Sequence, residues 1–209
     1  MQPMHCPTPL KRLTIIWTVG LILSGFSPYD RTTWFMEVAP ALIVLPVLLG
    51  TYKRFQFSSF TYYLITIHGI ILMLGGAYTY ARVPLGTWIQ DWLQLSRNPY
   101  DKIGHFAQGF IPAFIARELL IKIFKIPKGW LNDYLVVSIC LAISALYELI
   151  EWGAAIALGQ GADEFLGTQG DPWDTQSDMF MALIGASIAL LIFSRLHNRF
   201  IENLPTEIK

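Results

Sequence analysis

Carboxylate and imidazole side chains recur at helical spacing in three otherwise apolar segments of this 209-residue chain. Residues three or four positions apart lie on the same face of an α-helix. One imidazole among several carboxylate oxygens suits a hard or borderline divalent ion, so we predict a site for Mg, Mn, Ca or Zn. The predicted metal ligands are three such pairs: Asp101 with His105, Glu148 with Glu151, and Asp174 with Asp178.

A cation held by these residues would activate water or polarise a phosphoryl or acyl oxygen. Glu148 and His105 are the predicted catalytic residues, since a carboxylate or an imidazole beside the cation can act as a general base. The same side chains also fit an interpretation without metal. Carboxylates that lie close together at low dielectric repel one another, and they can share protons in a network that only holds three helices together. The sequence leaves both interpretations open.

The composition identifies the environment of these side chains. Hydrophobic residues make up 54% of the chain, charged residues only 14%, and the mean hydropathy is +0.45. Soluble domains carry roughly 25% charged residues, so an ordinary water-exposed surface is excluded, and so is a disordered chain. The 15 Lys and Arg residues equal the Asp and Glu residues in number, which leaves no basic excess for nucleic acid. We predict an integral membrane protein in contact with membrane lipids.

Six apolar segments approach the roughly 20 residues that a helix needs to cross a bilayer. Lipid offers the backbone no hydrogen-bond partners, so these segments are expected to be helices rather than strands. The predicted fold is an all-α bundle of six transmembrane helices that forms a single domain over residues 1–209. The expected spans are residues 13–26, 34–50, 58–80, 103–124, 134–157 and 178–196.

Basic residues are distributed unevenly between the two sides of such a bundle. Ten Lys and Arg residues fall on the side of the chain termini and four on the other side. The richer side is cytoplasmic by the positive-inside rule, so both termini are predicted to be cytoplasmic. We expect Arg117, in the inner half of the fourth span, to extend toward the interface. His197, between two arginines, is expected on the cytoplasmic surface.

This orientation brings the ionisable pairs together on the extracytoplasmic side. The fourth and sixth spans begin there, at Asp101 and Asp178, and the fifth span ends there. With a rise of about 1.5 Å per residue, His105 lies roughly 6 Å below Asp101, and Glu148 lies roughly 13 Å below the end of its span. Three helices thus contribute to one polar layer, with Glu37 of the second span as a candidate neighbour.

A short amphipathic segment separates the third span from the fourth. Leu85, Trp88, Ile89 and Trp92 recur at helical spacing with polar residues between them. This pattern predicts a short helix in the outer membrane interface, where tryptophan side chains lie at headgroup depth. A lid that packs on the bundle is the alternative interpretation.

Two sets of residues resemble known families. Residues 101–106 (DKIGHF), with Glu148 and Asp178, resemble the VanZ-like membrane proteins over the C-terminal half of the chain. Residues 147–152 (YELIEW) and 167–174 (GTQGDPWD) resemble the YjdF family of uncharacterised multi-pass proteins, and this resemblance spans the whole chain. It implies a six-span protein of the bacterial inner membrane and no established activity.

Three functions are compatible with the sequence. In the first, the polar layer is a periplasmic, metal-dependent site that acts on an envelope lipid or a lipid-linked substrate, although no nucleophile motif assigns a reaction and enzyme status is open. In the second, the same acids titrate in a proton-coupled transporter or carrier, which needs a polar path to the cytoplasm. In the third, the protein is a structural membrane subunit.

Overall fold

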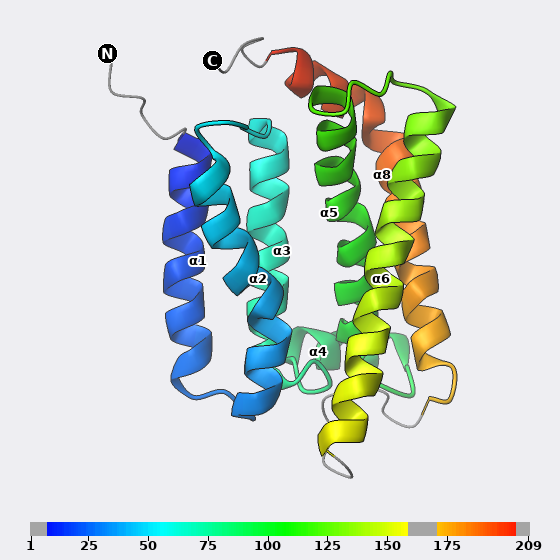
Figure 1. The fold of residues 1–209 in the computed structure, drawn as a ribbon. Coiled ribbons are helices and arrows are strands. Elements are labelled where there is room, and N and C mark those ends of the chain that lie inside the picture. The colour runs from blue at the N-terminus through cyan, green and yellow to red at the C-terminus, as the bar shows by residue number, and fades with distance from the viewer. Residues whose placement is uncertain (1–7, 159–170, 204–209) are drawn as a thin grey trace.

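The computed structural model describes residues 8–158 and 171–203, and most of these are helical (Figure 1). In chain order the helices are α1 (Thr8–Phe26), α2 (Arg31–Thr51), α3 (Ser59–Tyr78), α4 (Pro84–Leu93), α5 (Tyr100–Lys122), α6 (Trp130–Leu158) and α8 (Asp174–Glu202). Neither described range contains a β-strand. The all-α fold predicted from the sequence is confirmed.

The long helices run along a common axis in two groups (Figure 1). α1, α2 and α3 pack against one another in the first group, and α5, α6 and α8 do so in the second. α3 and α5 join the groups, whereas α2 and α6, which flank the junction, do not pack closely against each other. The start of α1 and the end of α8 lie at one end of the bundle, called the inner end here, and α4 lies at the opposite, outer end (Figure 1).

Five of these helices, α1, α2, α3, α6 and α8, are long and apolar enough to cross a membrane. α5 corresponds to the expected span 103–124 and has 23 residues, or about 34 Å at 1.5 Å per residue. It contains no stretch as apolar as those of the other five, because polar residues such as His105, Arg117 and Glu118 interrupt it. α5 packs against α3, α6 and α8, so its polar side chains are buried among neighbouring helices.

Local sequence signals set several helix boundaries. The Asp30 side chain accepts a hydrogen bond from the backbone N–H of Thr33 at 2.7 Å and caps α2. This hydrogen bond lowers the pKa of Asp30 below its ordinary value. Pro84 occupies the first turn of α4, where no helical hydrogen bond needs its missing N–H. α6 and α8 each begin one turn before the predicted apolar spans, since backbone hydrogen bonds and not apolarity determine where a helix begins.

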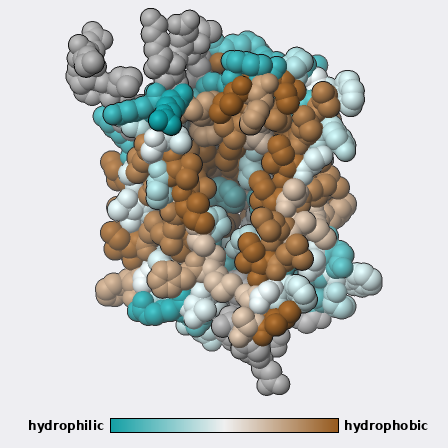
Figure 2. Space-filling view, in the orientation of Figure 1, coloured by the Kyte–Doolittle hydropathy of each residue, from teal (hydrophilic) through white to brown (hydrophobic). Residues whose placement is uncertain are grey.

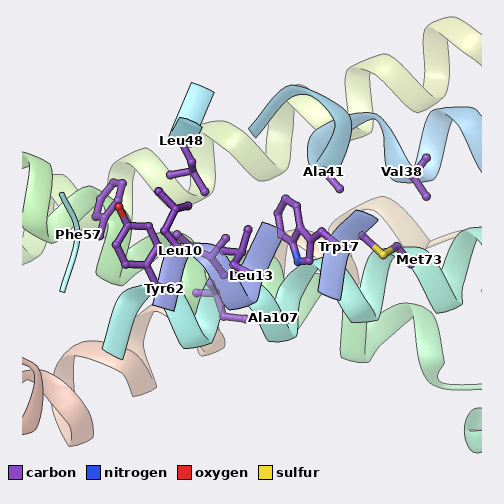
Figure 3. Packing of buried hydrophobic residues seen from close by; sticks show 12 residues of the cluster. Leu10, Leu13, Trp17, Val38, Ala41, Leu48, Phe57, Tyr62, Met73 and Ala107 are labelled. Atoms are coloured by element: carbon purple, nitrogen blue, oxygen red, sulfur yellow. The ribbon is translucent and has the colours of Figure 1, made fainter. Parts of the chain in front are cut away.

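Each group of helices has its own apolar core. In the first group, Leu13 and Trp17 of α1 pack against α2 and α3 (Figure 3). The Trp17 indole N–H donates to the backbone carbonyl of Thr66 at 3.2 Å, and a side chain at Gly69 would collide with the indole. In the second group, Phe114 of α5 packs with residues of α6 and α8. The two cores leave space between the groups, and a cavity lies there.

α5 and α8 run in the same direction and approach each other closely. Gly109 of α5 lies against the backbone of Ala182, and Gly185 of α8 lies against the backbone of Phe106 and Phe110. Small residues at such crossings let helix backbones approach closely in membranes. Because both helices begin at the outer end, this contact brings their first turns side by side.

The short helix predicted between the third and fourth spans is present as α4 at the outer end (Figure 1). Gly86 lies against Asn98, whose side-chain amide donates to the Val83 carbonyl at 3.1 Å. Trp88 and Trp92 are 70% and 81% exposed. Their exposure favours an interfacial helix over a lid that packs on the bundle.

Candidate functional site

The first two turns of α5 and of α8 bring three of the predicted site residues together. His105 Nε2 lies 3.5 Å from Asp101 Oδ1 and 3.8 Å from Asp178 Oδ2. One ligand atom from each of these residues lies within 4.8 Å of the other two. All three side chains are largely buried. We call Asp101, His105 and Asp178 the His105 cluster.

α6 contributes two glutamates to the same layer. Glu148 Oε1 lies 3.9 Å from His105 Nδ1, which is also 2.9 Å from Gln108 Oε1. Glu148 and Glu151 are both buried, at 7% and 8% exposure. Among the described residues, neither Glu148 Oε1 nor Asp101 Oδ2 has a hydrogen-bond partner, although both atoms are buried. Two carboxylate oxygens in this layer can therefore still accept a ligand.

Asp174 lies in an ion-pair network rather than in the His105 cluster. Its Oδ1 is 2.6 Å from Arg97 Nη2 and 2.7 Å from Lys102 Nζ. Lys102 also pairs with Asp178 Oδ1 at 2.7 Å and donates to Ser177 Oγ at 2.6 Å. Burial alone would lower the pKa of Arg97, but the hydrogen bond and the negative charge of Asp174 raise it above its ordinary value. Asp174 is thus neutralised by cations of the protein itself.

The spacing of the predicted metal ligands gave no indication that Arg97 and Lys102 belong to this layer. Two carboxylates four residues apart can hold one ammonium group between them as readily as they hold a metal ion. The available signal was therefore the spacing of Asp174 and Asp178 together with a lysine directly after Asp101. Nothing in the spacing distinguishes the two kinds of cation.

The charges of this outer layer do not balance among the described residues. Its cations are Arg97 and Lys102, with His105 as a third when protonated. At least three carboxylates are then left without a counter-charge, and they need bound protons or a cation because buried charges of one sign repel strongly. The buried carboxylates counted here are Glu37, Asp101, Glu148, Glu151, Asp174 and Asp178.

Glu37 joins the layer from α2. Its side chain is 5% exposed, and the Tyr147 hydroxyl of α6 donates to Glu37 Oε2 at 3.3 Å. This hydrogen bond connects α2 and α6 across the junction of the two helix groups. Both residues line the cavity that lies in this junction.

That cavity has a volume of about 390 Å³ and extends from the polar layer toward the inner end. Away from the layer its lining is apolar except for His68 of α3. Figure 2 shows the hollow between two hydrophobic walls, with more hydrophilic surface deep inside. Ligand pockets commonly have this character, with a mainly apolar wall and a few polar groups in one place. The polar end is lined by Glu37, Tyr80, Asp101, His105, Gln108, Tyr147 and Glu151.

A second buried polar cluster lies at the inner end. Glu118 Oε1 accepts hydrogen bonds from the hydroxyls of Ser58 at 2.5 Å and Thr61 at 2.6 Å, and it lies 3.0 Å from His197 Nε2. Arg117 Nη1 lies 3.2 Å from His197 Nδ1. His197 is 0% exposed, so the predicted surface position is wrong, and Arg117 is also buried, at 3% exposure. A buried carboxylate needs hydrogen-bond partners, and His197 is one of those of Glu118.

Residues 9–199 match the family described as predicted membrane protein (DUF2238). The chain belongs to the DUF2238 family. It is also 52% identical over 199 residues to the inner membrane protein YjdF of Escherichia coli (strain K12), an alignment that covers 95% of this chain and 93% of that protein. No solved structure matches. The resemblance based on residues 147–152 is confirmed, whereas part of the second motif, residues 167–170, lies outside the described residues.

All six predicted ligands of this DUF2238 protein fall within the matched range of residues 9–199. The family description and the name of the YjdF relative state a membrane location and no activity. A membrane protein with several apolar, membrane-length helices is therefore established. Its chemistry has to be argued from the site, since family membership alone assigns no reaction.

Proposed function

We propose that this DUF2238 protein crosses the bacterial inner membrane six times, with both termini in the cytoplasm and the outer layer facing the periplasm. Three observations support the proposal. The six long helices alternate in direction, basic residues are concentrated at the inner end, and the YjdF relative is named an inner membrane protein. The exposed tryptophans of α4 fit the headgroup region of the periplasmic leaflet.

Reporter fusions test this orientation. A C-terminal fluorescent protein should be bright and a C-terminal alkaline phosphatase inactive, because alkaline phosphatase is active only in the periplasm. The same two reporters fused after Leu95, between α4 and α5, should give the opposite pattern. An active C-terminal phosphatase would mean that the His105 cluster faces the cytoplasm.

We further propose that the outer layer binds a divalent cation. Ligand atoms bound to one cation at about 2.0–2.6 Å lie no more than about 5 Å from one another. The ligand atoms of the His105 cluster meet this condition, with separations within 4.8 Å. The convergence of buried, partly unpaired carboxylate oxygens on one imidazole is the observation that carries the proposal. Such a donor set suits Mg, Mn, Ca or Zn.

The function that this arrangement supports best is a metal-dependent reaction on an envelope lipid or a lipid-linked substrate. The site lies at interface depth beside an apolar cavity, so a lipid can present its headgroup there. The cation would polarise a phosphoryl or acyl oxygen or activate water. Glu148, 3.9 Å from His105, is positioned to act with it as the base.

Thermal melts test the metal. Wild-type protein should melt several degrees higher with a divalent ion than with chelator, since a ligand at a hundred times its Kd stabilises the folded state by about 2.7 kcal/mol. Glu148→Gln should lose most of this shift, because a neutral amide oxygen attracts a divalent cation less strongly than a carboxylate does. Glu202→Gln, at an exposed position at the inner end, should retain the shift.

The proton-sharing alternative predicts the reverse result. An amide mimics a protonated acid, so Glu148→Gln would then melt like wild type with or without chelator. A wild-type melt that none of Mg, Mn, Ca and Zn moves would remove the metal from the proposal.

A proton-coupled carrier receives less support. In the described part of the chain, the lining of the inner half of the cavity contains no charged side chain. Glu118 and His197 contact each other but do not belong to this lining. A structural subunit is the function that would be left if neither a metal nor a lipid binds.

A further inference from the structure

The cavity is long enough to hold a hydrocarbon chain. Its lining runs along α5 from Asp101 to Leu120, a distance of about 28 Å at 1.5 Å per residue. One leaflet of a bilayer has a hydrocarbon thickness of about 15 Å, half of the 30 Å core. Its volume of about 390 Å³ lies within the usual range of about 300–1,000 Å³ for ligand pockets. The length and the volume are together compatible with one extended hydrocarbon chain.

The mouth of the cavity faces the membrane. Val44 of α2 and Ile143 of α6 belong to the lining on the two sides of the junction, where these helices do not pack closely. The outward faces of both helices carry exposed apolar residues outside the lining, among them Ile43 at 64% and Leu146 at 58% exposure. The hydrophobic walls on both sides of the hollow are visible in Figure 2. A molecule at this mouth is therefore a lipid rather than water.

An empty cavity of this kind is unfavourable. The atoms of its lining lose dispersion contacts wherever no partner atom faces them. Water does not compensate in the apolar part of the cavity, because apolar cavities stay dry. A hydrocarbon chain from the adjacent bilayer restores these contacts, and in a membrane it is the available occupant.

We propose that the cavity binds one hydrocarbon chain of a phospholipid, which enters sideways between α2 and α6 and places its headgroup at the outer layer. The polar end carries Glu37, Asp101 and Glu151 beside the single imidazole of His105. This acidic surface favours a headgroup with an amine, as in phosphatidylethanolamine, over one with a phosphate alone. Binding of the hydrocarbon chain requires no metal. Only a metal-dependent reaction at the lipid headgroup rests on the proposed function.

Photolabelling of the full-length protein in lipid nanodiscs tests this inference. The probe is a phosphatidylethanolamine with a diazirine at the end of a palmitoyl chain, and crosslinks are mapped by mass spectrometry. We expect labelling at Leu119 and Leu120, at the inner end of the cavity, with chelator as well as with Mg. A phosphatidylglycerol probe with the same chain should label them less, and equal labelling would overturn the assignment of the headgroup.

Two neighbouring residues of α2 provide a matched pair of variants. Val44→Trp places an indole in the mouth and should reduce labelling of Leu119 and Leu120 by about tenfold, which corresponds to 1.4 kcal/mol of lost binding. Ile43→Trp, on the lipid-facing side of the same helix, should leave it unchanged. Ile143→Trp blocks the mouth from α6 and replaces Val44→Trp if that variant does not fold.

Labelling confined to lipid-facing residues such as Leu191, or unchanged by both mouth variants, would overturn the inference. Its failure is distinguishable from failure of the proposed function. Loss of the metal-dependent melting shift with intact labelling of Leu119 removes the metal and leaves the chain site. An intact melting shift without labelling of Leu119 removes the chain site and leaves the metal.

Discussion

Replacing Lys102 with methionine should lower the free energy of unfolding by up to about 3 kcal/mol, the lower end of the range for a fully buried ion pair. The Lys102 side chain is 20% exposed, and Arg97 still neutralises Asp174 in the variant, so Asp178 is the carboxylate left without its cation. The Lys102 ammonium lies 2.7 Å from Asp174 and 2.7 Å from Asp178, whose side chains are 7% and 2% exposed. Methionine retains most of the apolar stem of lysine, so the change is mainly one of charge. Thermal or denaturant unfolding of the purified protein measures the loss.

Two further variants separate the charge from other effects. Adding Asp178→Asn to Lys102→Met removes one stranded carboxylate and should restore part of the stability. Lys128→Met breaks a 2.6 Å ion pair with Glu202 whose side chains are 37% and 64% exposed. It should leave the melt unchanged, because exposed ion pairs contribute little. Equal losses in Lys102→Met and Lys128→Met would contradict the buried network.

Adding a methyl group at the crossing of α5 and α8 should also destabilise the protein. Gly109→Ala and Gly185→Ala should each lower the free energy of unfolding by about 1–3 kcal/mol, since an added carbon in a packed contact forces backbones apart. The new Cβ atoms would collide with the backbone of Ala182 and of Phe106, which cannot move aside as a side chain can. Both variants should also reduce the metal-dependent melting shift, because the crossing holds the first turns of α5 and α8 together.

The same substitution at Gly153 of α6 is the control. No atom lies within 4 Å of a Cβ built there, so alanine meets open space. Because alanine also favours a helix more than glycine does, Gly153→Ala should be neutral or slightly stabilising. A loss in Gly153→Ala as large as in Gly185→Ala would show that the crossing is not the cause.

Features that depend on local geometry were predicted correctly from the sequence. Asp101 and His105, four residues apart, share a helix face whatever surrounds them, and the structure brings them to 3.5 Å. The helices themselves follow from apolar length, since lipid satisfies no backbone hydrogen bond. α4 follows from a short amphipathic period, which is also a local feature of the sequence.

Features that depend on which helices meet were not predictable in this way. The partners of Lys102 lie 72 and 76 residues further along the chain, and only the parallel packing of α5 and α8 brings them together. The burial of His197 against Glu118 has the same origin, across 79 residues. The cavity, with lining residues from α2, α3, α5 and α6, exists only between packed helices.

By itself, the sequence determined that this protein is helical, that it belongs in a membrane, and which polar side chains share a helix face. The tertiary structure alone decided how each helix is turned about its own axis and which helix it meets. In water an apolar face marks the inside of a protein, but in a bilayer the lipid-facing and the protein-facing surfaces are both apolar. For this reason exposed Leu191 and buried Leu190 of α8 are the same type of residue, and the residue type does not show which one is buried. Small residues such as Gly185, which lies against the backbone of α5, decide which face of α8 meets a neighbouring helix.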